Sequence, residues 1–246
     1  MTLQWPWRPP DPLTPAVLLD FDGVVNALCR PPRVPRGYAR HTVWLDGATW
    51  PDHEWILPLI PSSGREFTVT LNPKNSQFVK ELLESGVFVA WATTWQHAVL
   101  PVVADNGFPA LPVLPIDRMH RPGERFHDTT SWKLAAFATF DKRTPLLFVD
   151  DSAGGCHSPT VGAHGGSLHV IVPRDSYGLT NRDRNAIRAW ANRQLRIQSR
   201  TSIADQAARV AANPRDRAET AAVLTGMETL DNDLDNTRDE NRDSTT

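Results

Sequence analysis

Two pairs of aspartates each follow a short, continuous apolar run of the sequence. Asp20 and Asp22 follow the first run, and Asp150 and Asp151 follow a later one. Four carboxylates converging on one point repel one another strongly unless a cation lies between them. The sequence places no paired His or Cys beside these hard oxygen ligands, so Mg²⁺ is the cation that we expect them to bind.

A hydroxyl group and an ammonium group accompany the aspartates. Thr93 and Thr94 follow a third apolar run, and Lys133 is placed in the first turn of a predicted helix just before the strand that ends at Asp150. Hydroxyl and ammonium groups beside a metal ion form a binding site for phosphoryl oxygens. Thr93 directly ends its apolar run, so we prefer it as the residue that binds a phosphoryl oxygen, with Thr94 as the alternative.

The two N-terminal aspartates suit different steps of a phosphoryl transfer. A carboxylate beside a metal-bound phosphate can attack phosphorus, which makes Asp20 a candidate nucleophile. Asp22, two residues later, can point the opposite way, protonate the leaving oxygen and then deprotonate a water molecule. Gly23 allows the chain to turn sharply after the strand. We therefore predict a Mg²⁺-dependent phosphohydrolase.

The elements that position these residues alternate between buried strands and helices. Continuous apolar runs, typical of strands buried on both faces, cover 16–19, 87–92, 145–149 and 168–172, and a Pro-containing edge strand is expected at 111–115. Helical spacing covers 75–85, 96–106, 131–140 with Ser131 as N-cap, and 181–198 with Thr180 as N-cap. This order predicts an α/β fold, a Rossmann-like parallel sheet with helices on both faces.

One long segment interrupts the alternation. Residues 27–72 separate the first strand from its helix and are far too long for an ordinary βα loop. Strand-like stretches at 42–45, 55–57 and 67–70 are separated by turn signals. We predict a small β-rich cap insertion that leans over the carboxyl edge of the sheet.

The remaining segments differ in composition from this core. Residues 1–15 form a Pro- and Trp-rich lead-in, the catalytic domain is predicted at 16–200, and short helices interrupted by Pro214 are predicted within 201–230. Residues 213–246 hold nine acidic residues and four arginines, whereas the rest of the chain is mildly basic. Residues 231–246 are predicted to be a disordered acidic tail.

Composition narrows the class of protein. The chain has 246 residues, no run of 18 apolar residues, and no basic segment followed by an apolar one at its N-terminus. We therefore expect no membrane span, no signal peptide and no membrane partner. Two cysteines without a CxxC motif suit a reducing compartment, so a cytoplasmic protein is expected.

The ordered set of Asp20-x-Asp22-Gly23, Thr93, Lys133 and Asp150-Asp151 resembles the haloacid dehalogenase-like (HAD) superfamily over residues 14–198. The resemblance implies a HAD fold in which Asp20 forms an aspartyl-phosphate and Asp22 is the acid/base. It further implies that Thr93 and Lys133 hold the phosphoryl group. Asp20, the backbone carbonyl of Asp22, Asp150 and Asp151 would bind Mg²⁺.

A narrower resemblance is carried by three segments, 91–95, 149–151 and 173–180. They are similar to the HAD branch of predicted RNA-repair (Swiss Army Knife) proteins of bacteria and phages. This resemblance implies a phosphorylated RNA or DNA end, or a nucleotide, as substrate and partner.

Basic loops near the predicted catalytic edge agree with a polyanionic substrate. The candidate rim consists of Arg30, Arg33, Arg36, Arg121 and Arg125. These arginines would hold further phosphates of a nucleic-acid end, although solvated loop charge is an equal interpretation. Two other functions stay open: a HAD phosphatase for a small metabolite or phosphoprotein, and a non-catalytic HAD-fold binding protein.

Overall fold

The computed structural model describes residues 7–29, 33–45, 63–116, 129–155 and 167–212. The candidate arginines Arg30, Arg121 and Arg125 lie outside these residues, as do the acidic tail and the predicted strand at 55–57. The described residues fall into two compact units, divided between Arg196 and Ile197. All of the predicted site residues that the structure describes belong to the first unit.

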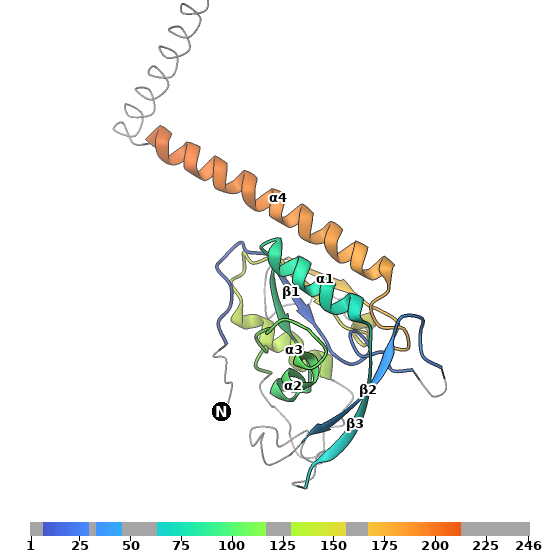
Figure 1. Cartoon of the computed structure of the whole chain (residues 1–246). Coiled ribbons are helices and arrows are strands. Elements are labelled where there is room, and N and C mark those ends of the chain that lie inside the picture. The colour runs from blue at the N-terminus through green and yellow to red at the C-terminus, as the bar shows by residue number, and fades with distance from the viewer. Residues whose placement is uncertain (1–6, 30–32, 46–62, 117–128, 156–166, 213–246) are drawn as a thin grey trace, which may run out of the picture. The chain divides into compact units, whose positions relative to one another are not determined.

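The first unit contains a parallel sheet of four strands in the order β4-β1-β5-β6, and Figure 1 labels its strand β1. The strands are β1 (Ala16–Leu19), β4 (Phe88–Trp91), β5 (Leu146–Val149) and β6 (Leu168–Ile171). All four predicted strands are thus present. β1, β4 and β5 are largely buried as predicted, whereas β6, at the edge of the sheet, is only partly buried, and its His169 is exposed. The stretch predicted as an edge strand at 111–115 contributes only an isolated parallel bridge, between Trp91 and Val113.

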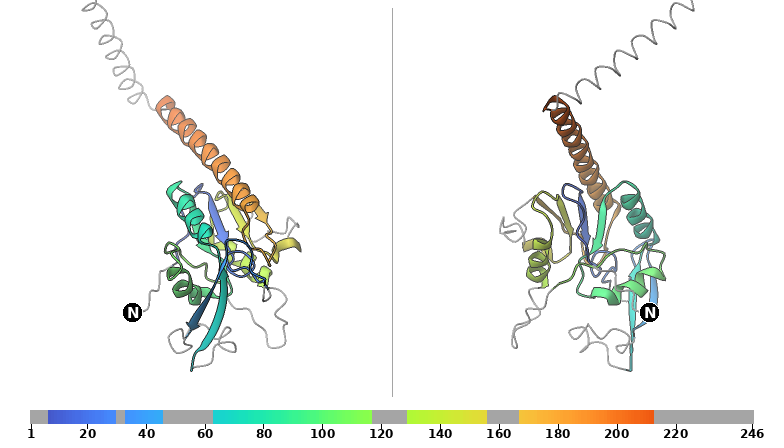
Figure 2. Two further views of the ribbon diagram at one scale, coloured as in Figure 1. Left: turned by 45° about the vertical axis from the view of Figure 1, so that its right-hand side comes forward. Right: turned by 90° about the vertical axis from the view of Figure 1, so that its left-hand side faces the viewer.

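Side chains alternate between the two faces of the central strand, as the pleat requires. Val17 and Leu19 lie in a core cluster with residues of α1 (Pro73–Glu84), α2 (Val99–Ala104) and α4 (Asn181–Ala212). Leu18 lies in a second cluster, with residues of α3 (Thr129–Ala136) and the 3₁₀ turn η3 (Phe137–Thr139). Helices therefore flank the sheet on both faces, which is a Rossmann-like arrangement (Figure 2).

An antiparallel pair of strands occupies part of the segment between β1 and α1. Strands β2 (Ala39–Leu45) and β3 (Arg65–Leu71) pair so that Ala39 lies opposite Leu71 and Leu45 opposite Arg65. Both strands are longer than the predicted stretches 42–45 and 67–70. The β-rich character predicted for this segment is present in its described part.

Two helix boundaries differ from the predictions. Ser131 lies inside α3, which already includes Thr129, so Ser131 is not its N-cap and Lys133 belongs to the second turn. α4 continues to Ala212, so no new helix begins near residue 201. Residues 199–212 contain neither Gly nor Pro, and nothing in the local sequence stops the helix there.

The predicted helix at 96–106 divides into two short pieces. The 3₁₀ turn η1 (Gln96–Ala98) precedes α2, and a further 3₁₀ turn, η4 (Ala153–Gly155), follows the second aspartate pair.

Among the described helices, none combines the length and the apolar character needed to cross a membrane.

Candidate functional site

Asp20, the predicted nucleophile, and Asp150, a predicted metal ligand, lie just beyond the carboxyl ends of neighbouring parallel strands. The backbone N–H of Asp20 donates to the carbonyl of Val149 at 2.9 Å, and that of Asp150 donates to the carbonyl of Ile171 at 3.2 Å. Each aspartate therefore extends the hydrogen-bonded ladder by one residue. This register fixes both backbones at the edge where open α/β sheets bind their ligands.

Lys133 joins the two strand ends. Its Nζ donates to Oδ2 of Asp20 at 2.5 Å and to Oδ2 of Asp150 at 2.7 Å. The lysine is only 1% exposed, although it comes from a helix and not from the sheet. The structure therefore brings together Asp20, Lys133 and Asp150, as the sequence predicts.

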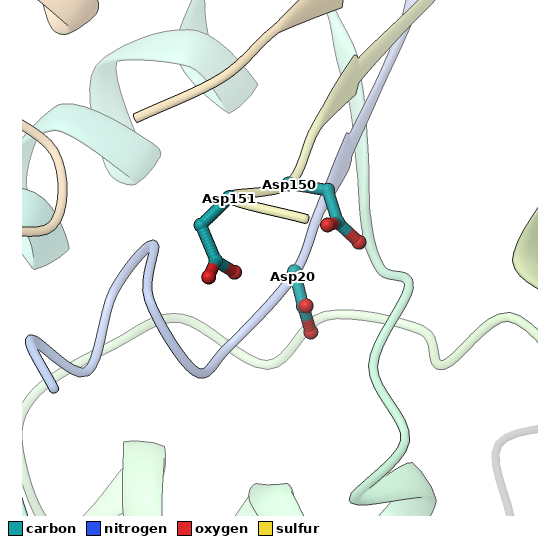
Figure 3. A group of neighbouring side chains, drawn as sticks. All are labelled: Asp20, Asp150 and Asp151. Atoms are coloured by element: carbon teal, nitrogen blue, oxygen red, sulfur yellow. The ribbon is translucent and has the colours of Figure 1, made fainter. Parts of the chain in front are cut away.

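Asp151 completes a cluster of three carboxylates with Asp20 and Asp150 (Figure 3). One oxygen from each lies within 4.8 Å of the others, so the three together could hold a metal ion. The absence of a side chain at Gly23 makes room for Asp151, because a Cβ there would lie 2.2 Å from its carboxyl carbon.

Burial makes ionisation of two of these carboxyls unfavourable. It raises the pKa of Asp20 to about 7, with Lys133 opposing the shift and Asp150 adding to it. Burial also raises the pKa of Asp151 to about 6, and the negative charge of Asp150 adds to this shift. Lys133 therefore does not fully offset the burial of these carboxyls, and a bound cation would favour their ionised forms.

Asp150 and Lys133 form the ionised pair of the cluster. Burial would raise the pKa of Asp150, but Lys133 and two hydrogen bonds from Ser152 together hold it below its ordinary value. Ser152 donates to Oδ1 of Asp150 from its backbone N–H at 2.8 Å and from its hydroxyl at 2.5 Å. Burial would lower the pKa of Lys133, but Asp20 and Asp150 raise it overall.

The carboxylate of Asp22 is not part of the cluster, so three carboxylates converge where the sequence predicted four. Its Oδ1 accepts from Nδ2 of Asn26 at 2.7 Å, and its Oδ2 accepts from Nε1 of Trp95 at 2.8 Å. These two donors fix the orientation of the Asp22 side chain. Burial raises its pKa, and both hydrogen bonds oppose the shift.

Thr93 follows β4, the strand that pairs with β1. The N–H of Ala92 donates to the carbonyl of Leu19 at 2.8 Å, which places Thr93 one residue further along the same sheet edge. Thr93 is fully buried and its hydroxyl oxygen accepts from the N–H of Trp95 at 3.2 Å, whereas Thr94 is half-buried. Both hydroxyls stay candidates for phosphate binding.

The described rim arginines lie on the segment before β2. Arg33 and Arg36 are exposed. Arg36 lines a cavity whose described lining includes none of the four aspartates. Arg36 therefore contributes to a cavity other than the aspartate cluster, and its role on the substrate rim stays a prediction.

The sequence does not predict the roles that three residues have at the site. Asn26 and Ser152 are ordinary polar loop residues, and the residue type of Trp95 indicates packing in the core or the cap, or stacking on bases. Trp95 does pack, with ring centroids 5.2 Å from Phe21 and 5.5 Å from Phe67. Its hydrogen bond to Asp22 spans 73 residues of sequence, and no local pattern signals such a bond.

No protein-family model matches the chain, and comparison with curated proteins and with solved structures gives no significant match.

Proposed function

We propose that the protein is a Mg²⁺-dependent phosphatase of the HAD type, which acts through an aspartyl-phosphate on Asp20. The observation that carries the proposal is the contact of Lys133 with both Asp20 and Asp150 at the carboxyl edge of a parallel sheet. The ordered resemblance of the motifs to the HAD superfamily supports it. The antiparallel pair β2–β3 would belong to the cap.

In the first step, a carboxylate oxygen of Asp20 attacks phosphorus, and the bond between phosphorus and the leaving oxygen breaks. Lys133 lies against the attacking carboxylate and neutralises charge on the phosphoryl group. Asp22 donates its proton to the leaving oxygen. Its raised pKa favours the protonated state that this donation requires.

In the second step, Asp22 takes a proton from a water molecule whose oxygen attacks phosphorus. The bond between phosphorus and Asp20 breaks, which restores the free carboxylate and releases inorganic phosphate. The hydrogen bonds from Asn26 and Trp95 keep Asp22 in place through both steps. Thr93 or Thr94 would bind a phosphoryl oxygen.

The donor set fits Mg²⁺, because three oxygen ligands converge and two of them have raised pKa values. Asp20, Asp150 and Asp151 would hold the ion with their carboxylates, and Asp22 with its backbone carbonyl. The ion would supply positive charge that screens the phosphoryl oxygens from the nucleophile.

The substrate class that we propose is a phosphorylated nucleic-acid end or a nucleotide. The similarity of three segments to the RNA-repair branch of the superfamily supports this class, as do the exposed charges of Arg33 and Arg36. A small phosphorylated metabolite or a phosphoprotein is the alternative.

The test is hydrolysis of a generic aryl phosphate by the full chain with Mg²⁺, compared between wild type and Asp20→Asn. The matched control is Asp105→Asn, an exposed aspartate after α2. We expect Asp20→Asn to abolish turnover and Asp105→Asn to preserve it. Unchanged turnover in Asp20→Asn would exclude the mechanism.

A substrate panel then separates the candidates. It compares 3′- and 5′-phosphorylated oligonucleotides with nucleotides, sugar phosphates and phosphopeptides. The highest kcat/KM is expected for an oligonucleotide or a nucleotide. Mg²⁺ binding without turnover of any compound would favour the non-catalytic binding protein.

A further inference from the structure

A cavity with several cationic lining residues is formed by residues outside the aspartate cluster. It has a volume of about 560 Å³ and is formed where three distant segments meet: 35–38, 72–74 and 177–184. Its size falls within the range of small-molecule sites and exceeds that needed for a single inorganic phosphate. None of its lining residues takes part in the proposed phosphatase chemistry.

The cavity is lined by three cationic side chains, Arg36, Lys74 and Arg184, and no acidic side chain is among its described lining residues. Arg36 and Lys74 are exposed, whereas Arg184 is only 5% exposed. A buried guanidinium without a carboxylate in the same cavity favours an anionic occupant.

The hydrogen bonds of Arg184 go to neutral acceptors. NH1 donates to Oδ1 of Asn75 at 2.5 Å and to the carbonyl of Leu179 at 2.9 Å, and NH2 donates to Oδ1 of Asn181 at 2.6 Å. These bonds fix the guanidinium in place but do not neutralise it. The carboxylates of Asp183 and Glu81 act on this charge from nearby, but neither lines the cavity.

Two helices begin at this cavity and add to its positive potential. Asn72 caps α1 by accepting from the N–H of Lys74 at 3.0 Å, and Thr180 and Asn181 stand at the start of α4. The nearby carboxylate of Asp183 already accepts two hydrogen bonds from Thr180. Helix N-termini favour bound anions, so the dipoles and the three cations act in the same sense.

Tyr177 provides an aromatic surface at the same cavity. Its side chain is 52% exposed, and the turn that carries it is held by hydrogen bonds from the N–H groups of Tyr177 and Gly178 to the carbonyl of Arg174, both at 2.9 Å. At Gly178, a Cβ would lie 2.6 Å from the carbonyl of Val24, so only glycine lets this turn approach so closely. The backbone of the turn is therefore held in place, and Tyr177 lines the same cavity as the cations.

We propose that this cavity binds a phosphodiester group of a single-stranded nucleic acid, with the phosphate held by Arg36, Lys74 and Arg184 and a neighbouring base stacked on Tyr177. Cationic grooves combined with exposed aromatic rings are the usual way in which proteins bind single strands. A hydrogen bond from the N–H of Leu179 to the carbonyl of Val24, 2.8 Å long, ties the cavity wall to the loop that follows Asp22. The proposal extends the proposed function by giving the nucleic acid a second point of attachment.

The experiment measures binding of an internally labelled single-stranded oligonucleotide to the full chain by fluorescence anisotropy over a series of salt concentrations. The oligonucleotide carries hydroxyl groups at both ends and the buffer contains EDTA. Neither a terminal phosphate nor a metal ion is then present, so the result does not depend on the phosphatase reaction. A failed phosphatase assay and a failed binding assay are therefore distinguishable.

The test variant is Arg36→Gln combined with Lys74→Gln, because both side chains are exposed and Arg184 can stay in its buried bonds. The matched control is Lys80→Gln combined with Arg193→Gln, two exposed cations on the same helices α1 and α4 but outside the cavity lining. We expect the test variant to weaken oligonucleotide binding by roughly tenfold or more. The slope of log affinity against log salt concentration should become smaller by roughly one to two. The control should change the affinity less than about twofold.

Tyr177 is tested by a pair of variants. Tyr177→Phe keeps the ring and should bind as wild type, whereas Tyr177→Ala should bind roughly tenfold more weakly. Equal affinity of the cavity variant and its control, or oligonucleotide binding that does not respond to salt, would overturn the proposal. The proposal would also be overturned if inorganic phosphate and unlabelled oligonucleotide displaced the labelled oligonucleotide at the same concentration. A simple anion site would then explain the binding.

Discussion

The indole of Trp95 donates a hydrogen bond from Nε1 to Oδ2 of Asp22 at 2.8 Å, and this contact fixes the side chain proposed as the acid/base. Asn26 holds the other carboxylate oxygen, so both oxygens of Asp22 have a donor. The aromatic packing of Trp95 against Phe21 and Phe67 holds the indole in turn. Trp95 is therefore a positioning residue whose hydrogen bond also lowers the pKa of Asp22.

Trp95→Phe tests this role, since it removes the indole N–H and keeps an aromatic ring. Loss of the hydrogen bond raises the pKa of Asp22, so the protonated acid persists to higher pH. The alkaline limb of the plot of kcat/KM against pH should therefore shift to higher pH. We expect kcat to fall roughly tenfold, because the carboxyl is less well oriented. Trp44→Phe, at an indole that is 64% exposed, is the control and should leave the profile unchanged. An unshifted profile in Trp95→Phe would show that the contact only packs.

Lys133 is expected to be a major source of stability in the metal-free protein. Lys133→Met leaves the buried carboxyls of Asp20 and Asp150 without their shared counter-charge. Removing one member of a buried ionic group typically lowers the free energy of unfolding by about 3–5 kcal/mol. Urea denaturation measures this loss. The exposed Lys80→Met should change the same quantity by about 0.5 kcal/mol or less, and similar curves for the two variants would contradict the prediction.

The backbone of the site could be predicted from the sequence more fully than its side-chain contacts. Continuous apolar runs ending at Asp20 and Asp150 are local signals, and parallel pairing brings their ends to one edge. The bond between Trp95 and Asp22 depends on how the two loops pack, which no periodicity encodes. The sequence also predicts the start of α3 too late. Ser131 is a good N-cap by residue type, but it lies within the helix. The cavity around Arg184 requires three segments that only tertiary folding brings together.

Gly23 and Gly86 form a natural pair for testing the space that Asp151 needs. Both have left-handed backbones, with φ of 69° and 88°, but a Cβ at Gly86 meets nothing within 4 Å. Each glycine-to-alanine variant should therefore lose about 1–2 kcal/mol of stability from its backbone alone. Only Gly23→Ala also displaces the carboxylate of Asp151, so it should weaken Mg²⁺ binding at least tenfold, by order of magnitude. Titration calorimetry measures the affinities, and equal affinities in the two variants would exclude Asp151 as a ligand.

Mg²⁺ affinity should rise with pH, because protons compete with the ion for the same carboxyls. In the metal-free protein, the pKa is about 7 for Asp20 and about 6 for Asp151, against an ordinary value of 3.8. Between pH 3.8 and the raised pKa of each group, the folded chain keeps a proton that the unfolded chain has lost. The contribution of these two groups to stability therefore falls as pH rises through that range. Mg²⁺ needs the deprotonated forms, and its affinity should increase from about pH 5 to pH 8 with release of protons on binding.

Calorimetry in buffers of different ionisation enthalpy measures this proton release directly. Asp151→Asn removes one of the two titrating carboxyls, so it should both weaken binding and flatten the part of the pH dependence near 6. Asp105→Asn is the matched control, since it removes an exposed carboxyl after α2 and should leave affinity and proton release unchanged. Affinity that is constant from pH 5.5 to 8 in the wild type would contradict the predicted competition between protons and metal at this cluster.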